Sequence, residues 1–270
     1  MKLRVGFIGA GAMAEALIKG LIKAGASPTQ LLASDVLPSR LALLHSQYGI
    51  KVANSNVEVL CQSDIVILAV KPQNISSVLQ EIAGCAMNGG QMPLLVSIAA
   101  GITLAYIEQL LPLPYPLVRA MPNTPSIVGA GATAISAGKH AKPEHLRQAR
   151  SVFEAVGIVV SIPETQIDAV TGLSGSGPAY GYLIIEALID AGVKVGLPRG
   201  IAKELAVQTL FGAAKMVAET EQHPAVLKDQ VTSPGGTTIA GVHILEQGGI
   251  RGLIMDAVIG ATERARQLKQ

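Results

Sequence analysis

A strand, a glycine turn and the start of a helix occupy the first residues of the chain. The apolar run Arg4–Ile8 is followed by a segment with the spacing GxGxxA. Gly9 permits a tight turn, Gly11 lets the backbone approach a ligand closely, and Ala14 is small enough for a helix to pack against a strand. Free N–H groups at the N-terminus of such a helix bind anions, so this unit predicts a dinucleotide-binding α/β domain. The residues expected around the pyrophosphate are Gly9, Ala10, Gly11, Ala12 and Met13.

Short apolar runs alternate with amphipathic segments from the N-terminus to about residue 162. This alternation predicts a mostly parallel, doubly wound sheet of the Rossmann type. The expected strands are Arg4–Ile8, Leu31–Asp35, Asp64–Val70, Leu94–Ile98, Leu117–Ala120, Ala132–Ser136 and Ile158–Ile162. The expected helices are Ala12–Ala24, Ser39–Tyr48, Asn74–Gly84, Thr103–Leu111 with Thr103 as N-cap, and Pro143–Val156 closed by Gly157.

After Pro163 the β-branched runs stop and every long segment has a helical period. The chain is therefore expected to consist of a dinucleotide-binding domain, 1–162, and an all-α domain, 163–270. The expected helices are Glu164–Thr171, Pro178–Val195, Pro198–Thr220, Pro224–Val231, Pro234–Glu246 and Ile250–Leu268. Several are apolar on more than one face, which favours a second copy of the chain covering them.

Composition excludes several classes of protein. Only 15% of residues are charged, and no apolar run approaches the roughly 18–20 residues of a membrane span, which predicts a soluble protein. The net charge of +2 comes from scattered Lys and Arg, unlike a nucleic-acid-binding surface. Cys61 and Cys85 form no CxxC pair and the histidines have no metal-ligand spacing, so we expect a cytoplasmic protein without a metal.

The opening Met1-Lys2-Leu3-Arg4 also resembles the start of a leader peptide, with Ala12-Met13-Ala14 as a cleavage site. Gly9 and Gly11 interrupt its apolar part, however. The polar residues that follow recur every four positions, as on the solvent-exposed face of a helix. We therefore expect these residues to belong to the folded domain.

Two strand ends supply further candidate cofactor residues. Asp35 lies about twenty residues after the glycine turn, where an acid accepts hydrogen bonds from the adenosine ribose of NAD. Arg40, with Ser39 beside it, is close enough in sequence to receive the 2′-phosphate of NADP. NADPH is therefore the preferred cofactor, with NADH as the alternative. Val70-Lys71-Pro72 ends another strand at the edge of the crevice, where Lys71 can reach ribose or a substrate carboxylate.

Three further segments are rich in small or polar residues. In the loop from Arg119 to Pro125, Asn123 and Thr124 are expected to offer donors to the same crevice. The segment Thr171–Tyr180 fits close helix packing as well as it fits ligand binding. The segment Val231–Thr238 is more specific: Ser233 is expected as a helix N-cap with Pro234 at the first helical position. Its two glycines and two threonines would form a pocket for a small carboxylate.

The segments TGLSGSGPAY (171–180), GLPR (196–199), EQHP (221–224) and SPGGTT (233–238), with AVKP (69–72) and the N-terminal loop, resemble pyrroline-5-carboxylate reductases over essentially the whole chain. The resemblance implies a Rossmann domain, a helical domain that interlocks two subunits, larger rings of dimers in many members, and reduction of a cyclic imine with NADPH or NADH. It implies cofactor contacts at Gly9, Ala10, Gly11, Ser34, Asn56, Ala69, Lys71 and Ser97. It implies substrate contacts at Glu164, Thr237 and Thr238, with Val231–Gly236, including Gly235 and Gly236, shaping the pocket.

No His, Lys or Tyr stands out as an acid–base catalyst, and a protonated imine held near the nicotinamide needs none. Thr238 is expected to hydrogen-bond the ring nitrogen, the Ser233–Thr237 turn to hold the carboxylate, and Glu164 to orient the site or to cap a helix. Glu221 is a further candidate whose role the residues leave open. One rival is a 3-hydroxyacid dehydrogenase, although Pro178–Ala191 lacks the lysine base that such enzymes need. The other is a protein that binds the nucleotide without turnover.

Overall fold

The computed structural model describes residues 3–84 and 92–268. Its first part is built on an eight-stranded sheet with the order β3-β2-β1-β4-β5-β6-β7-β8, in which all neighbours are parallel except β6 and β7. This confirms the predicted fold class. The strands are β1 (Val5–Ile8), β2 (Leu31–Ser34), β3 (Lys51–Val52), β4 (Ile65–Leu68), β5 (Leu94–Ser97), β6 (Leu117–Met121), β7 (Gly131–Ala137) and β8 (Gly157–Ser161).

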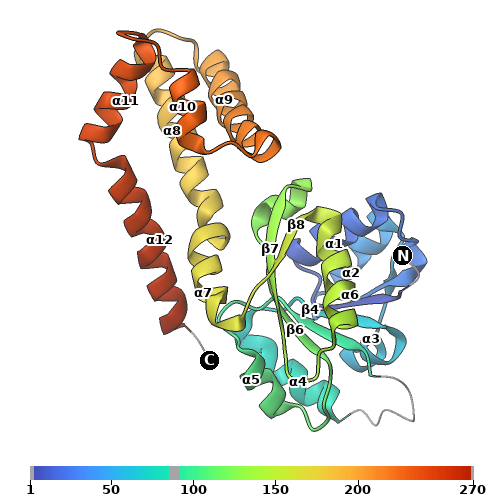
Figure 1. Ribbon diagram of the computed structural model, residues 1–270. Helices are drawn as coiled ribbons and strands as arrows, with labels where there is room; N and C mark the ends of the chain where they lie inside the picture. Colours follow the sequence, from blue (N-terminus) through green and yellow to red (C-terminus); the bar gives the residue numbers. More distant parts are fainter. Residues whose placement is uncertain (1–2, 85–91, 269–270) are drawn as a thin grey trace. The chain divides into compact units, whose positions relative to one another are not determined.

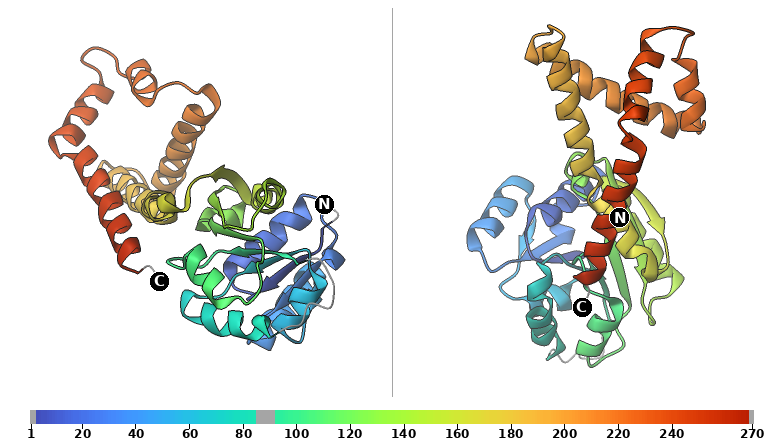
Figure 2. Two further views of the ribbon diagram at one scale, coloured as in Figure 1. Left: turned by 60° about the horizontal axis from the view of Figure 1, so that its bottom comes forward. Right: turned by 90° about the vertical axis from the view of Figure 1, so that its left-hand side faces the viewer.

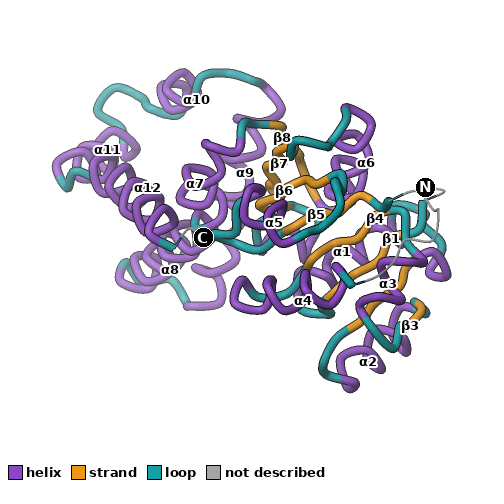
Figure 3. The backbone as a smooth tube through the Cα atoms, turned by 90° about the horizontal axis from the view of Figure 1, so that it is seen from below, coloured by secondary structure: helices purple, strands orange, loops and turns teal. Residues whose placement is uncertain are grey.

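Helices cover both faces of this sheet (Figures 1 and 3). One apolar core joins the sheet to α1 (Ala12–Lys23), α2 (Pro38–Tyr48) and α6 (Pro143–Phe153). A second core joins its other face to α3 (Asn56–Gln62), α4 (Ile75–Ala83) and α5 (Leu104–Leu110). Short 3-10 helices lie at Pro28–Gln30, Pro72–Asn74, Thr124–Val128 and Glu154–Val156. The sheet is buried on both faces because its strands are nearly continuous apolar runs.

From residue 164 to residue 268 the described chain is helical apart from its turns, as predicted. A short 3-10 turn at Glu164–Gln166, α7 (Ile167–Val170) and a π-helical turn at Thr171–Gly175 precede the long helices. These are α8 (Gly177–Lys194), α9 (Arg199–Thr220), α10 (Pro224–Gln230), α11 (Thr237–Gln247) and α12 (Ile250–Gln267), drawn in yellow to red in Figure 2. The close approach of α8 to α9 requires Gly192, because a Cβ there would meet the Cβ of Ala202 at 2.9 Å.

The chain divides into two compact units, and the borders between them differ from the expected domain border between residues 162 and 163. One unit comprises Met1–Ser176 with Gly260–Gln270, and the other comprises Gly177–Ile259. The first helical turns belong with the sheet because Ile167 and Asp168 are buried and α7 contacts β7. The last turns of α12 belong there too, since the carbonyl oxygen of Leu268 lies beside Gly101.

Several boundaries differ from the prediction by one to three residues, and one strand and one α-helix were missed. Strand β3 and helix α3 lie between Lys51 and Gln62, where the sequence analysis places no element. Thr103 is the N-cap of α5 as predicted, because its Oγ1 accepts the Tyr106 N–H at 3.1 Å. Of the predicted features, Met1, Lys2 and Cys85 lie outside the described residues. Across residues 3–84 and 92–268, no helix combines the length and apolar character needed to cross a membrane.

Candidate functional site

The glycine turn between β1 and α1 has the geometry of a phosphate loop. Gly9 adopts φ +98°, and a Cβ there would meet the carbonyl oxygen of Ala69 at 2.6 Å, so only glycine fits. Gly11 is the N-cap of α1, and a Cβ added to it meets nothing within 4 Å. Ala12 and Met13 form the first helical turn, whose N–H groups have no partner within the helix. The turn therefore combines an exposed backbone with the positive end of a helix dipole.

Two side chains, Asp35 and Arg40, bind the peptide groups of Ala10, while Glu15 binds Arg40 and Tyr48 binds Glu15. We name these four side chains the Ala10 clamp. The Ala10 N–H donates to Asp35 Oδ2 at 2.6 Å, while its carbonyl oxygen accepts from Arg40 Nε at 2.9 Å and Nη2 at 2.8 Å. Arg40 Nη2 also donates to Glu15 Oε2 at 2.8 Å, and the Tyr48 hydroxyl donates to Glu15 Oε1 at 3.0 Å. The Arg40 and Asp35 side chains were expected to face the cofactor, and their bonds to the loop were not predicted.

The hydrogen bond from Arg40 lowers the pKa of Glu15 below its ordinary value, and the Tyr48 hydroxyl lowers it further against the opposing effect of burial. Burial raises the pKa of Tyr48, with a further contribution from the Glu15 carboxylate. Glu15 is therefore ionised and Tyr48 protonated near neutral pH, so the clamp contains one intact ion pair.

A cleft of about 610 Å³ lies at the carboxyl ends of β1, β2 and β4, where the strand order reverses between β1 and β4. Ligands of open α/β sheets bind at such a switch point. Seven of the expected cofactor residues line it, namely Gly9, Gly11, Asp35, Asn56, Ala69, Val70 and Lys71. Ile8, Val36, Gln73, Asn74, Ser77, Val78 and Glu81 complete the lining. The structure thus gathers residues from four separate segments around one opening.

Three of the other expected cofactor residues are Ser34, Ser97 and Pro72. Ser34 is buried, and its hydroxyl donates to Asn56 Oδ1 at 2.7 Å. Ser97 is fully buried at the end of β5, with its Oγ 3.4 Å from the Ala99 nitrogen. Pro72 begins the 3-10 helix that follows Lys71. None of the three is among the residues that line the cleft.

Glu81 is a cleft residue that the sequence analysis missed. Its carboxylate accepts hydrogen bonds from Asn56 Nδ2 at 2.6 Å and from the Asn56 N–H at 3.2 Å. The bonds fix the Asn56 amide with its oxygen on Ser34 and place a negative charge at the N-terminus of α3. No motif in the sequence connects Glu81 with Asn56, because they are brought together by the packing of α3 on α4.

A partly buried ion pair joins β6 to the start of α5. Arg119 has a side chain only 2% exposed, and its Nη1 donates to Glu164 Oε1 at 2.9 Å. The same carboxylate oxygen accepts the Leu104 N–H at 2.7 Å, in the first turn of α5. Glu164 therefore caps a helix and neutralises a buried guanidinium, which matches the structural alternative considered for it. The sequence analysis placed Arg119 in the expected strand Leu117–Ala120 and at the start of the segment that follows it, and assigned it no role.

Asn123 does not offer its amide to the crevice in the way that the sequence suggested. Its Nδ2 donates to the Ser174 carbonyl oxygen at 3.0 Å, and its Oδ1 accepts the Ala132 N–H at 2.9 Å. The buried amide thus ties the π-helical turn to β7. A buried amide is held where its donor and acceptor are both satisfied, which explains this outcome.

The segment Ser233–Thr238 in the second unit differs from its predicted form. Ser233 is not a helix N-cap, because α11 begins at Thr237 with Gly236 as its N-cap. Pro234 and Gly235 instead occupy the centre of a turn that is closed by the Gly236 N–H donating to the Ser233 carbonyl oxygen at 3.0 Å. Gly235 has φ +65°, as expected of the glycine in a Pro-Gly turn. Thr237 and Thr238 are therefore the first two residues of α11, where backbone N–H groups have no helical partner.

Glu221, whose role the sequence left open, is the one non-glycine residue with positive φ in the described ranges 3–84 and 92–268. It ends α9 at φ +53°. Such a conformation is uncommon for a residue with a Cβ and is often found at functional sites.

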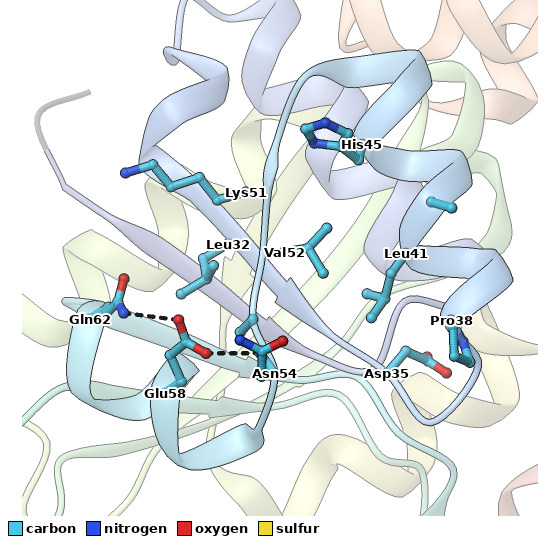
Figure 4. Close-up of a pocket in the computed structure, with 12 residues that line it drawn as sticks. Leu32, Asp35, Pro38, Leu41, His45, Lys51, Val52, Asn54, Glu58 and Gln62 are labelled. Atoms are coloured by element: carbon cyan, nitrogen blue, oxygen red, sulfur yellow. Dashed lines mark hydrogen bonds between the residues drawn. The ribbon is translucent and has the colours of Figure 1, made fainter.

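A larger hollow of about 780 Å³ lies along the edge strand β3, between α2 and α3 (Figure 4). Its floor contains Leu32, Leu41 and Val52, and its wall carries Glu58 in hydrogen bonds to Asn54 and Gln62. It shares Asp35 with the cleft at the switch point. Because it follows the side of the sheet and lacks the glycine turn, we assign the cofactor to the smaller cleft.

Within the described residues, no group of three or more His, Cys, Asp or Glu side chains is placed to hold a metal ion.

Two family descriptions match successive parts of the chain. Residues 4–101 match "NADP oxidoreductase coenzyme F420-dependent", and residues 164–268 match "Pyrroline-5-carboxylate reductase dimerisation". The chain is 48% identical to a pyrroline-5-carboxylate reductase of Synechocystis sp., over 99% of both chains. It is also similar to the structure of a pyrroline-5-carboxylate reductase from Coxiella burnetii, at 38% identity, a TM-score of 0.94 and coverage of 100% of both chains. The structure of a Plasmodium falciparum pyrroline carboxylate reductase with NADP bound gives 33% identity and a TM-score of 0.87, covering 100% of this chain and 99% of that one.

Proposed function

The chain belongs to the pyrroline-5-carboxylate reductase family, and from this premise we propose that it reduces 1-pyrroline-5-carboxylate to L-proline with NADPH or NADH. The observation that carries the proposal is the extent of the similarity, which covers 99% of the chain at 48% identity. It therefore includes both the glycine turn of the first unit and the Ser233–Thr238 segment of the second.

The cleft at the switch point fits a nicotinamide dinucleotide. Gly11 leaves open space where a side chain would obstruct a pyrophosphate, and the first turn of α1 offers N–H groups to the anion. NADPH is the preferred cofactor, supported by the NADP bound in the P. falciparum relative, and NADH is accepted as well. The residues proposed to hold it are Gly9, Ala10, Gly11, Ala12, Met13, Ser34, Asp35, Arg40, Asn56, Ala69, Val70, Lys71, Pro72 and Ser97.

When bound, the reduced nicotinamide supplies a hydride to the imine carbon, and the electron pair of the C=N bond passes to the ring nitrogen. A protonated ring nitrogen accepts this pair directly, so the protein needs no acid or base at the reacting atoms. Its task is to orient the ring, a contribution on the order of 7–11 kcal/mol for well-aligned reactants.

The substrate residues are proposed on and before α11. The turn Ser233–Gly236 and the first N–H groups of α11 suit a carboxylate, and the Thr238 hydroxyl suits the ring nitrogen. Val231, Ser233, Gly235, Gly236, Thr237 and Thr238 form the proposed set. The resemblance also implies Glu164, whose carboxylate is bound by Arg119 and Leu104, and its contact with substrate stays a prediction.

The functional division into a cofactor domain, 1–162, and a substrate and dimerisation domain, 163–270, belongs to the same proposal and is supported by the family match to residues 164–268. The proposal includes a homodimer, and the resemblance implies that many members of the family assemble further into rings of dimers. Neither nucleic acid nor a membrane is a proposed partner, given the scattered charges of the sequence. The absence of a CxxC pair supports a cytoplasmic location.

The experiment is a spectrophotometric assay with the purified full-length chain. Oxidation of NADPH or NADH is followed after addition of 1-pyrroline-5-carboxylate, and L-proline is quantified in the product. Cofactor oxidation that depends on the imine, with an equal amount of proline formed, is the expected result. Cofactor binding without turnover would instead support the nucleotide-binding alternative.

A further inference from the structure

We propose that Arg40 is a positioning residue, which holds the glycine turn between β1 and α1 in its binding conformation for NADH and NADPH alike. In this proposal Arg40 does not bind the 2′-phosphate of NADPH. The inference rests on the proposed function, because it assumes that the cleft binds a nicotinamide dinucleotide. It assigns Glu15 and Tyr48 to the same task, although neither lines the cleft.

The first argument is the geometry of the Ala10–Gly11 peptide. The Ala10 carbonyl oxygen accepts two hydrogen bonds from one guanidinium, at 2.9 Å and 2.8 Å. In a trans peptide the C=O and the following N–H point in opposite directions. Fixing the Ala10 carbonyl on Arg40 therefore aims the Gly11 N–H the other way, and Gly11 is one of the residues that line the cleft.

The second argument is that both peptide groups of Ala10 are restrained. Its N–H donates to Asp35 Oδ2 at 2.6 Å, and Asp35 Oδ1 is fixed in turn by the Leu37 N–H at 2.8 Å. A rotation of either peptide bond about the Ala10 Cα would break a charge-assisted hydrogen bond. A glycine-rich turn has wide conformational freedom, so these restraints reduce the ordering cost of binding an anion.

The third argument is the charge on Arg40. Its guanidinium is neutralised by Glu15 at 2.8 Å, and the Tyr48 hydroxyl at 3.0 Å keeps that carboxylate in place. A 2′-phosphate would have to draw Arg40 away from the Ala10 carbonyl and from Glu15. It would also lie near the Asp35 carboxylate at the end of β2, where the adenosine ribose is expected. The guanidinium is therefore already bound to the Ala10 carbonyl oxygen and to Glu15.

The test measures dissociation constants of NADH and NADPH for the full-length protein and three variants. Arg40→Met removes the guanidinium and keeps an apolar stem, and Glu15→Gln removes the charge that holds it. Arg4→Met is the matched control, because Arg4 forms a comparable ion pair with Asp64 at 2.8 Å but is 57% exposed and lies outside the cleft. We expect Arg40→Met to raise both dissociation constants about tenfold, with their ratio unchanged within about twofold.

Glu15→Gln is expected to raise the dissociation constants of NADH and NADPH by a common factor that is smaller than in Arg40→Met. Arg4→Met is expected to change neither dissociation constant. The loss in Arg40→Met should appear in kcat/KM as a common factor for both cofactors, whereas Arg4→Met should leave kcat/KM unchanged. Melting curves of Arg40→Met and Arg4→Met separate this binding effect from a general loss of stability.

Three results would overturn the inference: a rise confined to NADPH in Arg40→Met, no rise for either cofactor, or tighter NADPH binding in Glu15→Gln through a released guanidinium. If Arg40→Met fails to fold, Arg40→Lys decides, because it keeps the charge but cannot form the forked contact. Retained NADPH affinity in Arg40→Lys would then contradict positioning. Failure of the unaltered protein to bind either cofactor would refute the proposed function instead, so the two failures are distinguishable.

Discussion

Gly9 and Gly11 lie two positions apart in the phosphate loop but are required for different reasons. Gly9 is confined by its φ of +98° and by the Ala69 carbonyl oxygen, so its constraint lies within the fold. Gly11 has open space around it and lines the cleft, so its constraint comes from the ligand. The GxGxxA pattern predicts both glycines correctly, but only the structure separates their roles.

Substitution of the two glycines should therefore give opposite results. Gly9→Ala is expected to lower the free energy of unfolding by about 1–3 kcal/mol through strain. Gly11→Val should leave the free energy of unfolding within about 1 kcal/mol and raise the NADPH dissociation constant at least about a hundredfold. Denaturation curves and cofactor titrations check both. Unchanged NADPH affinity in Gly11→Val would refute the assignment of this loop.

Thr238, the second residue of α11, carries the central substrate contact in the proposed mechanism. Thr238→Val keeps the shape of the side chain and removes its hydroxyl, so turnover should fall about tenfold to a thousandfold, equivalent to about 1.4–4 kcal/mol. Thr238→Ser should recover most of the activity, and NADPH affinity should not change in either variant. If both variants kept full turnover and differed only in melting temperature, Thr238 would be a packing residue.

At the scale of single elements, α5 depends on a residue sixty positions away. Glu164 supplies the carboxylate that accepts hydrogen bonds from its first turn and from the buried Arg119 guanidinium. From the sequence, Glu164 was expected either to orient the substrate site or to cap a helix. The structure favours the cap, because one oxygen accepts both hydrogen bonds at 2.7 and 2.9 Å.

Glu164→Gln should accordingly act on stability. Loss of the charge beside a buried guanidinium is expected to lower the free energy of unfolding by about 3–5 kcal/mol. The KM for 1-pyrroline-5-carboxylate should change less than about threefold, since a structural contact contributes little differential binding. Denaturation and steady-state kinetics test this, with Glu108→Gln, from an ion pair with the exposed Lys139, as a control. A large rise in KM at unchanged stability would assign Glu164 to the substrate.

Some elements were predictable from local sequence and others were not. Buried strands such as β4 and β5 are continuous apolar runs, so their positions followed from hydrophobicity. Strand β3 has two residues, both exposed, and carries no such signal. Helix α3 did have a signal that was overlooked: Ser55 accepts the Glu58 N–H at 3.1 Å, in the spacing of a capping box. In Ser233–Gly236, turn formation by Pro-Gly outweighed the N-cap preference of serine.

At the scale of the molecule, the second unit lacks an adequate core of its own. Within Gly177–Ile259, Ala202 and Ala206 are the buried apolar residues, while large apolar side chains are exposed along its helices. A helical unit of this size needs further apolar burial to be stable, which agrees with the match to a dimerisation domain. Apolar residues on several helix faces predicted this property, whereas no local pattern could predict Arg119 or Glu81, whose partners are distant in sequence.

Disrupting this apolar surface should separate the subunits. Leu183 on α8 is 67% exposed, and Leu183→Arg is expected to shift sedimentation toward the monomer and to lower turnover at least about tenfold. Leu43→Arg is the matched control on α2 of the first unit, where Leu43 is 44% exposed, and it should alter neither property. Full activity of the unaltered protein as a monomer at micromolar concentration would contradict the role of this surface in assembly.

Transfer of a labelled hydride tests the central claim most directly. The full-length enzyme is given 1-pyrroline-5-carboxylate and NADPH in which both hydrogens on C4 of the nicotinamide are replaced by deuterium. The proline formed is analysed by mass spectrometry and NMR. The account predicts one deuterium per proline, on the ring carbon that was the imine carbon, with the carboxylate-bearing carbon unlabelled. Proline without deuterium, or no proline at all, would contradict it.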